Sequence, residues 1–122
     1  MERFGSALLA DRLLDSLDAL FARLQDALAK EPGRTYLTID ADAVHVRDVP
    51  GVSAPNGAGL RGEDVLKLAR QAGASPGVAS LDLAEINPRY DRDGQSARWA
   101  ALVVWNFLAG LATRCPTSRP PV

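Results

Sequence analysis

The chain has 122 residues, enough for one small domain with its own core, and its 47% hydrophobic and 24% charged residues are typical of a globular protein. A net charge of −1 gives no basic footprint for nucleic acid or for an anionic membrane, so we expect neither partner. The single cysteine, Cys115, cannot form an internal disulfide, as is usual in a reducing compartment. The residues that follow Met1 do not have the pattern of a signal peptide, so we expect a cytoplasmic location.

The first half of the chain is predicted to contain a helix, a strand and a long loop. Leucines at three- and four-residue spacing predict a helix from about Ser6 to Lys30, ended by Pro32-Gly33. Thr35–Asp40 is nearly all apolar or β-forming, as in a strand covered on both faces. The stretch from Ala41 to Gly59 has no evident structure, and loops of this length are often functional.

The second half is predicted to repeat the pattern as helix, strand and helix. Arg61–Ala72 reads as a helix with Gly73 as its stop, and Gly77–Leu83 reads as a second buried strand. Asp93 is a plausible N-cap for a last helix, Gln95–Thr113. That helix is apolar nearly all round, which favours a buried core helix over a membrane span.

The order helix, strand, helix, strand, helix predicts an α/β fold with a parallel strand pair joined by a right-handed crossover. Two parallel strands make a poor sheet on their own, because parallel sheets need several strands covered on both faces. The chain therefore looks like part of something larger. We expect residues 1–113 to form this portion of a domain and residues 114–122 to be a disordered tail.

Two carboxylates follow the first strand, where ligands bind in open parallel sheets. If the chain stays extended, Asp40 and Asp42 lie on the same face, roughly 7 Å apart. Such a pair repels itself unless a cation or a proton lies between, and carboxylates suit Mg, Ca or Mn. A helix N-cap or a solvated turn would explain the same residues equally well.

Asp82 and Glu85 come at the end of the second strand. If the two strands are parallel neighbours, four carboxylates converge on one edge of the sheet, which suits a metal and a cationic substrate group. Alternatively, Glu85 forms a salt bridge with Arg89 or Arg92.

Two further motifs are weaker signals. His45 could be a third metal ligand or a proton shuttle, or a loop histidine exposed to solvent. Residues 57–62 match GxGxxG, with Asp82 about twenty residues beyond, as in a dinucleotide-binding unit. The glycines of that unit must follow the first strand directly, whereas here a long loop with two prolines intervenes.

Two segments together resemble the C-terminal part of the arginase/agmatinase/formimidoylglutamase (ureohydrolase) family. They are TYLTIDADAVHVRDVPGVSAP at residues 35–55 and SLDLAEINPRYDRDGQSARWAALVVWNFL at residues 80–108. The likeness covers about Thr35 to Ala112, and it implies a partial three-layer α/β/α sandwich. Within the family, PGVSAP and the DxDGxxAR entry to the last helix are similar to formimidoylglutamase. His45-Val46 departs from the family pattern, so the loop is expected to differ there.

The resemblance implies roles for four acidic residues. The family's strand-end Asp-x-Asp supplies ligands to two manganese ions, so Asp40 would bridge both ions and Asp42 would bind one. Glu85, in the D-x-x-E-x-N-P segment, would bind the amidine or guanidinium group of the substrate, with Asp82 supporting it. No side chain of this chain is assigned as catalytic, because the family's metals activate a bridging water for attack on the amidine carbon.

The implied reaction is hydrolysis of N-formimidoyl-L-glutamate to L-glutamate and formamide, in histidine breakdown. The family's Gly-Gly-His and Asp-Ala-His-x-Asp metal segments do not occur in these residues, so the chain alone is expected to be inactive. Expected partners are a small amidine substrate and either the missing N-terminal portion of the fold or further copies in a homo-oligomer. A non-catalytic remnant acting by protein association and a dinucleotide-binding module stay as alternatives.

Overall fold

The computed structural model describes residues 35–114, together with Ala19, Ala22, Gln25 and Asp26. The chain divides into two units, Met1–Pro32 and Gly33–Val122. The four described residues of the first unit are helical, in agreement with the sequence. The rest of the predicted helix Ser6–Lys30, its Pro32-Gly33 stop and the tail from Cys115 onward lie outside the described residues.

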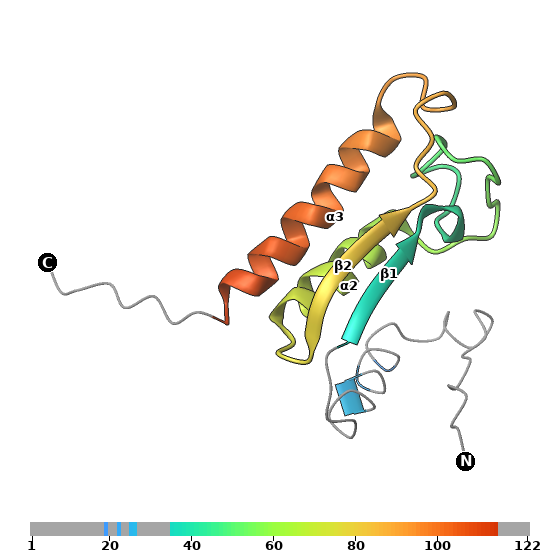
Figure 1. Cartoon of the computed structure of the whole chain (residues 1–122). Coiled ribbons are helices and arrows are strands. Elements are labelled where there is room, and N and C mark those ends of the chain that lie inside the picture. The colour runs from blue at the N-terminus through green and yellow to red at the C-terminus, as the bar shows by residue number, and fades with distance from the viewer. Residues whose placement is uncertain (1–18, 20–21, 23–24, 27–34, 115–122) are drawn as a thin grey trace, which may run out of the picture. The chain divides into compact units, whose positions relative to one another are not determined.

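The second unit is built around two parallel strands. Its elements are β1 (Thr35–Asp40), η2 (a 3-10 turn, Ala41–Ala43), α2 (Gly62–Ala74), β2 (Val78–Ala84) and α3 (Gln95–Ala112) (Figure 1). β1 pairs with β2 in parallel, with Asp40 opposite Ala84. The predicted α/β class, element order and parallel pairing are therefore confirmed for this part of the chain.

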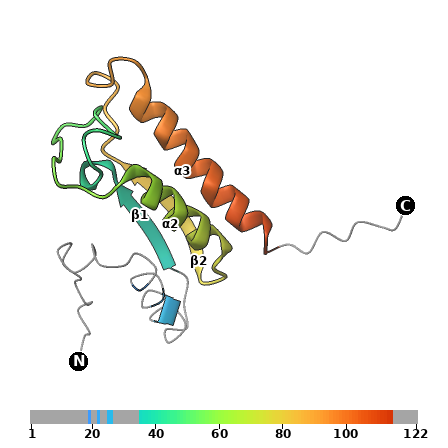
Figure 2. The same cartoon turned by 180° about the vertical axis from the view of Figure 1, so that it is seen from behind.

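The helices cover one face of the sheet. α2 lies behind the strands in Figure 1 and in front of them when the molecule is turned (Figure 2). The side chains that pack into the core from the strands are Leu37, Ile39, Leu81 and Leu83. Tyr36, Thr38 and Asp40 point to the other face and are exposed. The prediction that β1 is covered on both faces is wrong for the described residues, because they place no layer over that second face.

Two glycines set the contact between α2 and α3. A Cβ on Gly73 would overlap the carbonyl oxygen of Phe107, and one on Gly110 would overlap that of Arg70. Gly73 is therefore a buried helix–helix contact and not the predicted stop, and α2 continues to Ala74. Small residues at such a crossing allow two helix backbones to approach closely.

α3 is only partly buried, which corrects the prediction of a core helix. Ser96, Trp99, Val103 and Gly110 are its buried residues. Five large apolar side chains are exposed instead: Leu102, Val104, Trp105, Leu108 and Leu111. The reason is that one side of α3 packs against α2 and the loops, while the described residues leave its other side uncovered. None of the described helices combines the length and apolarity required to cross a membrane.

The long loop between η2 and α2 is packed rather than free. Val44, Val49 and Val52 are at most 1% exposed and belong to the same core as Trp99 and Val103. Short parallel bridges join Val44 to Leu60 and His45 to Asn56. The loop therefore extends the core beyond the carboxyl ends of the strands.

The tight helix crossing predicts a clear effect of adding one methyl group. Gly110→Ala should lower the free energy of unfolding by about 1–3 kcal/mol, as overpacking does, despite the better helix propensity of alanine. Gly57→Ala is the matched control, because nothing lies within 4 Å of a Cβ there, and its effect should stay within about 0.5 kcal/mol. Urea unfolding followed by circular dichroism measures both; equal midpoints for the two variants would contradict the crossing.

Candidate metal and substrate site

The loops that follow β1 and β2 are joined to each other at the carboxyl end of the sheet. The Asn87 N–H donates to the Gly51 carbonyl oxygen at 2.8 Å, and the Gly51 N–H donates to Ser96 Oγ at 2.7 Å. The Gln95 side-chain amide donates to the carbonyl oxygens of Arg47 and Asp48, at 2.8 and 3.0 Å. These bonds fix the first loop against the start of α3.

Two aspartates bind the free N–H groups at the start of α3. The carboxylate of Asp91 accepts from the N–H groups of Ser96 and Ala97, at 3.0 and 2.9 Å, and Asp93 accepts from Gln95 at 3.1 Å. The Ser96 N–H holds the pKa of the Asp91 carboxyl below its ordinary value. The N-cap position itself is Gly94, with φ of 75°, so the prediction of Asp93 is off by one residue although its carboxylate does cap.

Asp48 plays the same part at the start of α2. Its Oδ2 accepts from the Gly62 N–H at 2.8 Å, and this bond is the main reason that the pKa of Asp48 is lowered. The Gly62 carbonyl oxygen in turn accepts from the indole N–H of Trp99 at 3.2 Å. Asp48, Gly62 and Trp99 therefore join the loop, α2 and α3, and none of the three was predicted as a site residue.

Asp40 is the last residue of β1, and the chain then turns instead of staying extended. The Asp42 N–H donates to Asp40 Oδ1 at 2.8 Å, so Asp40 caps the 3-10 turn. The N-cap interpretation is thus confirmed for Asp40, and the extended spacing predicted for the pair is wrong. Asp42 Oδ1, however, is buried without a hydrogen-bond partner among the described residues.

That unpartnered oxygen bears on the metal that the Asp-x-Asp pattern predicts. A buried carboxylate oxygen without a partner is costly, and a cation would satisfy it. Carboxylate oxygens also suit Mn among the divalent metals. Asp42, with Asp40 beside it, therefore fits as part of a manganese site.

Glu85 follows the last residue of β2 in an unusual backbone conformation. Its φ is 67°, and it is the only non-glycine residue with a positive φ in the described part of the chain. Non-glycine residues in this region are strained and cluster at functional sites. Its side chain is exposed, and no ion pair joins it to Arg89 or Arg92 within residues 35–114, so the salt-bridge alternative is not observed.

Asp82 lies within β2, opposite Thr38, rather than at the strand end. Its Oδ2 accepts from the Tyr36 hydroxyl at 2.6 Å, and this bond raises the pKa of the Tyr36 phenol. Both side chains belong to the uncovered face of the sheet, the face that also carries Asp40. Asp82 thus lies two residues before Ala84, the last residue of β2, and its carboxylate is hydrogen-bonded to Tyr36.

The acidic residues do not form a complete metal site. Residues 35–114 hold no group of three or more His, Cys, Asp or Glu side chains that could bind a metal ion, so the predicted convergence of four carboxylates is wrong for these residues. His45 does not complete a group with Asp40 and Asp42. It is half-buried rather than exposed, and its Nδ1 accepts from the Arg47 N–H at 3.0 Å, which stabilises a turn.

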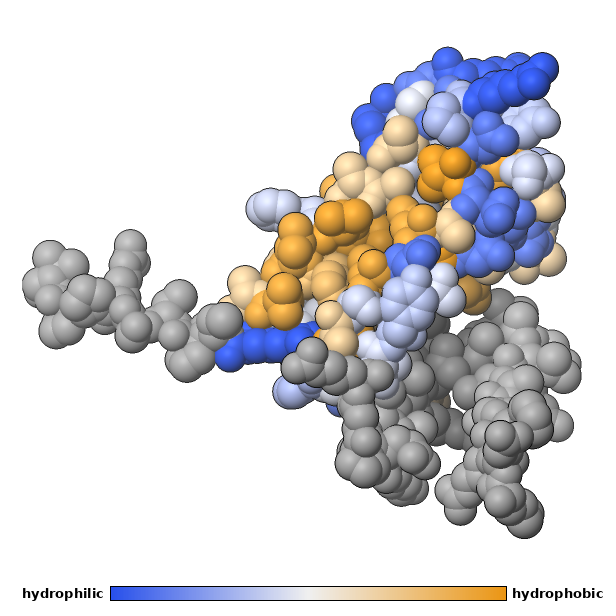
Figure 3. Space-filling view, viewed as in Figure 1, coloured by the Kyte–Doolittle hydropathy of each residue, from blue (hydrophilic) through white to orange (hydrophobic). Residues whose placement is uncertain are grey.

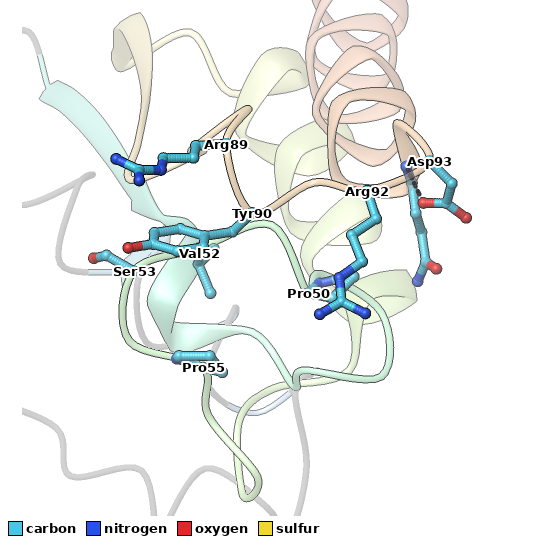
Figure 4. A pocket seen from close by; sticks show the side chains of 9 residues that line it. Pro50, Val52, Ser53, Pro55, Arg89, Tyr90, Arg92 and Asp93 are labelled. Atoms are coloured by element: carbon cyan, nitrogen blue, oxygen red, sulfur yellow. Dashed lines mark hydrogen bonds between the residues drawn. The ribbon is translucent and has the colours of Figure 1, made fainter.

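A depression of about 660 Å³ lies between the two loops. It is lined by Pro50, Val52, Ser53 and Pro55 from the first loop and by residues between Arg89 and Gln95 from the second. Figure 4 shows the side chains of Arg89 and Arg92 extending to different sides of it rather than toward each other. None of Asp40, Asp42, Asp82 and Glu85 lines this depression.

The glycine motif at residues 57–62 is not arranged for dinucleotide binding. η2 and the packed loop separate it from the end of β1, so no tight strand-to-helix turn is formed. Gly59 instead packs against the backbone of Val44 and His45, where a Cβ would lie 2.6 Å from His45 N.

Sequence reasoning missed the residues that hold the site together. Ser96 and Gly51 are 45 residues apart, and their bond follows from no local pattern. Asp91 could have been found, because an aspartate shortly before an apolar helical run is a capping signal.

Comparison with known proteins gives the chain a family. Residues 2–110 match the model of the Arginase family. A formimidoylglutamase of Enterobacter sp. (strain 638) is 41% identical over 82 residues, which are 67% of this chain and 26% of that protein. A formimidoylglutamase of Citrobacter koseri is 34% identical over 106 residues, covering 87% of this chain and 33% of that protein.

Solved structures agree with this match. The crystal structure of a Trypanosoma cruzi formiminoglutamase with Mn²⁺ superimposes with a TM-score of 0.71 at 32% identity, covering 80% of this chain and 34% of the other. The chain thus spans between about a quarter and a third of the length of these relatives. Because the family model matches nearly the whole chain, the chain belongs to the arginase family.

Proposed function

We propose that this chain is the C-terminal portion of a manganese-dependent hydrolase of linear amidines, of the formimidoylglutamase type. The reaction is hydrolysis of N-formimidoyl-L-glutamate to L-glutamate and formamide, a step of histidine breakdown in the cytoplasm. The observation that carries the proposal is the buried, unpartnered Oδ1 of Asp42 beside Asp40 at the end of β1. Relatives named for this activity, one of them solved with Mn²⁺, support it.

The proposed roles follow from the chemistry of each side chain. Asp42, through its buried Oδ1, and Asp40 would both hold manganese, while Asp40 Oδ1 keeps its bond to the Asp42 N–H. A manganese site there would supply an activated water for attack on the amidine carbon. The carboxylate of Glu85 would hold the cationic amidine by charge-assisted hydrogen bonds. Once water has added to the amidine carbon, the C–N bond to the glutamate nitrogen would break, that nitrogen would take up a proton from the added water, and formamide and L-glutamate would leave.

Asp82 would act as a supporting residue. It lies on the same face of the sheet as Asp40, and its bond to the Tyr36 hydroxyl fixes its orientation. Partners that orient metal ligands or substrate-binding groups in this way commonly change affinity or activity about 10–100-fold when removed.

The chain needs a complementary polypeptide to complete the site. The Gly-Gly-His and Asp-Ala-His-x-Asp segments are absent from these 122 residues, and the described residues offer no third metal ligand. We therefore propose that the isolated chain is inactive, and that a segment carrying those motifs supplies the other ligands. Additional copies in a homo-oligomer would not supply them, because each copy has the same residues.

A second candidate function is association without catalysis. The exposed apolar residues of α3 favour it, since large exposed apolar patches mark interaction sites. The two functions differ in their dependence on Asp40 and Asp42, because association alone does not use these carboxylates.

Removing a metal ligand should abolish activity. The chain is combined with the N-terminal portion of the Enterobacter relative, and formamide release from N-formimidoyl-L-glutamate is measured with and without Mn²⁺. Asp40→Ala and Asp42→Ala should each lower the rate more than about 100-fold. Loss of a residue that only supports a metal ligand typically lowers activity by about 10–100-fold, so a larger loss indicates a ligand. Glu63→Ala, an exposed site on α2, should leave the rate unchanged. Full activity of Asp40→Ala would refute the metal assignment.

The Tyr36–Asp82 bond predicts a change in phenol titration that needs no activity. In a Tyr90→Phe background Tyr36 is the only tyrosine, and its pKa should exceed the ordinary value of about 10. Asp82→Asn removes the acceptor's charge, so the pKa should fall toward that value. Because the folded pKa is raised, the bond stabilises the fold below about pH 10 and is lost as the pH rises through the folded value. Absorbance at high pH measures the shift; identical titrations with and without the substitution would exclude the bond.

A further inference from the structure

The depression of about 660 Å³ between the two loops contains two arginine side chains without a partner. Arg89 and Arg92 both line it, both are exposed, and neither guanidinium forms a hydrogen bond or an ion pair within residues 35–114. A guanidinium stays charged at any pH at which the protein is folded, and its planar set of donors matches a carboxylate or a phosphate. The depression can therefore bind anionic groups.

The acidic residues near the depression leave these arginines without a counter-charge. Asp93 is the one acidic residue among those that line it, and its Oδ1 accepts from the Gln95 N–H at 3.1 Å. In Figure 4 the Asp93 carboxylate lies apart from the guanidinium of Arg92. The carboxylate of Asp91 is already bonded to N–H groups at the start of α3. Figure 3 shows the wider setting, in which hydrophilic side chains gather over this end of the sheet and apolar ones gather along α3.

The two guanidinium groups serve different parts of the depression. In the view of Figure 4, Arg89 extends to the side of the Tyr90 and Ser53 hydroxyls, and Arg92 extends to the side of Pro50. Neither hydroxyl has a hydrogen-bond partner within residues 35–114, so both can donate to a ligand. A single small anion contacts only one guanidinium in this arrangement, whereas a ligand with two separated anionic groups can use both.

The remaining lining is apolar. Pro50, Val52 and Pro55 contribute side chains without a polar group, and the ring of Tyr90 adds an aromatic surface. Such a lining suits methylene groups rather than a further charged group. A short aliphatic chain between two carboxylates therefore matches both the charged and the apolar parts of the depression.

The two sides of the depression are held in place by the backbone. The Asn87 N–H is bonded to the Gly51 carbonyl oxygen, which fixes the second loop against the first. Asn87 in turn accepts from the next residues, its Oδ1 from the Arg89 N–H and its carbonyl oxygen from the Tyr90 N–H, both at 3.0 Å. A site that is formed before its ligand arrives loses less affinity to ordering of the protein.

From these observations we infer that the depression binds a short aliphatic dicarboxylate, with one carboxylate at Arg89 and the other at Arg92. This site is separate from the candidate metal and substrate site, because Asp40, Asp42 and Glu85 do not line it. L-glutamate, the product of the proposed reaction, belongs to this class of ligand, and that identification alone rests on the proposed function.

The test follows backbone amide resonances of the isotope-labelled full chain during titration with glutarate, acetate and inorganic phosphate. Glutarate should shift the resonances of residues 50–55 and 89–95 to saturation. It should bind about tenfold or more tightly than acetate or phosphate, because each of those contacts one guanidinium only. L-glutamate should bind within about tenfold of glutarate, and added salt should weaken binding of both.

Substitutions at exposed positions separate the site from the fold. Arg89→Gln and Arg92→Gln should each weaken glutarate binding about tenfold or more, while resonances outside the depression stay unchanged. Arg70→Gln is the matched control, since it removes the same charge from an exposed position on α2 that does not line the depression, and it should bind glutarate like the parent chain.

The inference would be overturned by glutarate that binds no more tightly than acetate or phosphate, by shifts that do not centre on the depression, or by equal loss of binding in the Arg70 variant. Binding of glutarate without binding of L-glutamate would overturn the identification of the product. The titration uses neither metal nor a complementary polypeptide. A chain that binds glutarate but gives no manganese-dependent activity when combined with that polypeptide would refute the proposed function and leave this site standing.

Discussion

Gly51 joins the two loops on which the candidate site depends. Its N–H donates to Ser96 at the start of α3, and its carbonyl oxygen accepts from Asn87 in the segment after β2. No side chain fits at this point, because a Cβ would lie 2.5 Å from the Cβ of Asp91. The loop that follows Asp42 and the segment that follows Glu85 are therefore joined by one backbone hydrogen bond between stretches that are distant in sequence.

The remaining contacts reinforce this junction. Asp91 and Asp48 bind the first N–H groups of α3 and α2, and the lowered pKa of each carboxyl reflects those bonds. Valine side chains of the long loop complete the core beneath them. A loop held in this way supports the neighbouring carboxylates of Asp40 and Asp42, and a metal site requires ligands that are preorganised by their surroundings.

The sequence predicts the two strands and their parallel pairing, because these depend on local hydrophobic pattern and on the crossover rule. It ends the second strand at Leu83, one residue before the observed end at Ala84. It predicts Asp40 and Asp42 as candidate ligands because two carboxylates follow the first strand, where ligands bind in open parallel sheets, and because they match the Asp-x-Asp of the family. It does not predict the buried contact of Gly73 with α3, since a glycine near a helix end usually stops the helix. Nor does it predict the exposed side of α3, because an apolar pattern states what a helix prefers to contact and not whether the contact is present.

Of these two departures only the exposed side of α3 concerns what lies beyond this chain, because the Gly73 contact is made within it. The chain spans between about a quarter and a third of the length of its arginase-family relatives. Its apolar pattern therefore includes positions that contact other parts of the fold in a full-length protein. We propose that groups beyond the described residues account for the exposed apolar residues of α3, the uncovered face of the sheet and the unpartnered Asp42 oxygen. In our proposal, the chain supplies some of the residues of the metal and substrate site, and a complementary portion supplies the others.

Manganese binding tests this account most directly. Titration of Mn²⁺ followed by electron paramagnetic resonance would be run on the isolated chain and on the chain assembled with the complementary portion. The account predicts that the isolated chain leaves the ion free in solution, whereas the assembled pair binds it and loses most of that affinity with Asp42→Ala. Tight binding by the isolated chain, or binding by the pair that survives Asp42→Ala, would contradict the account.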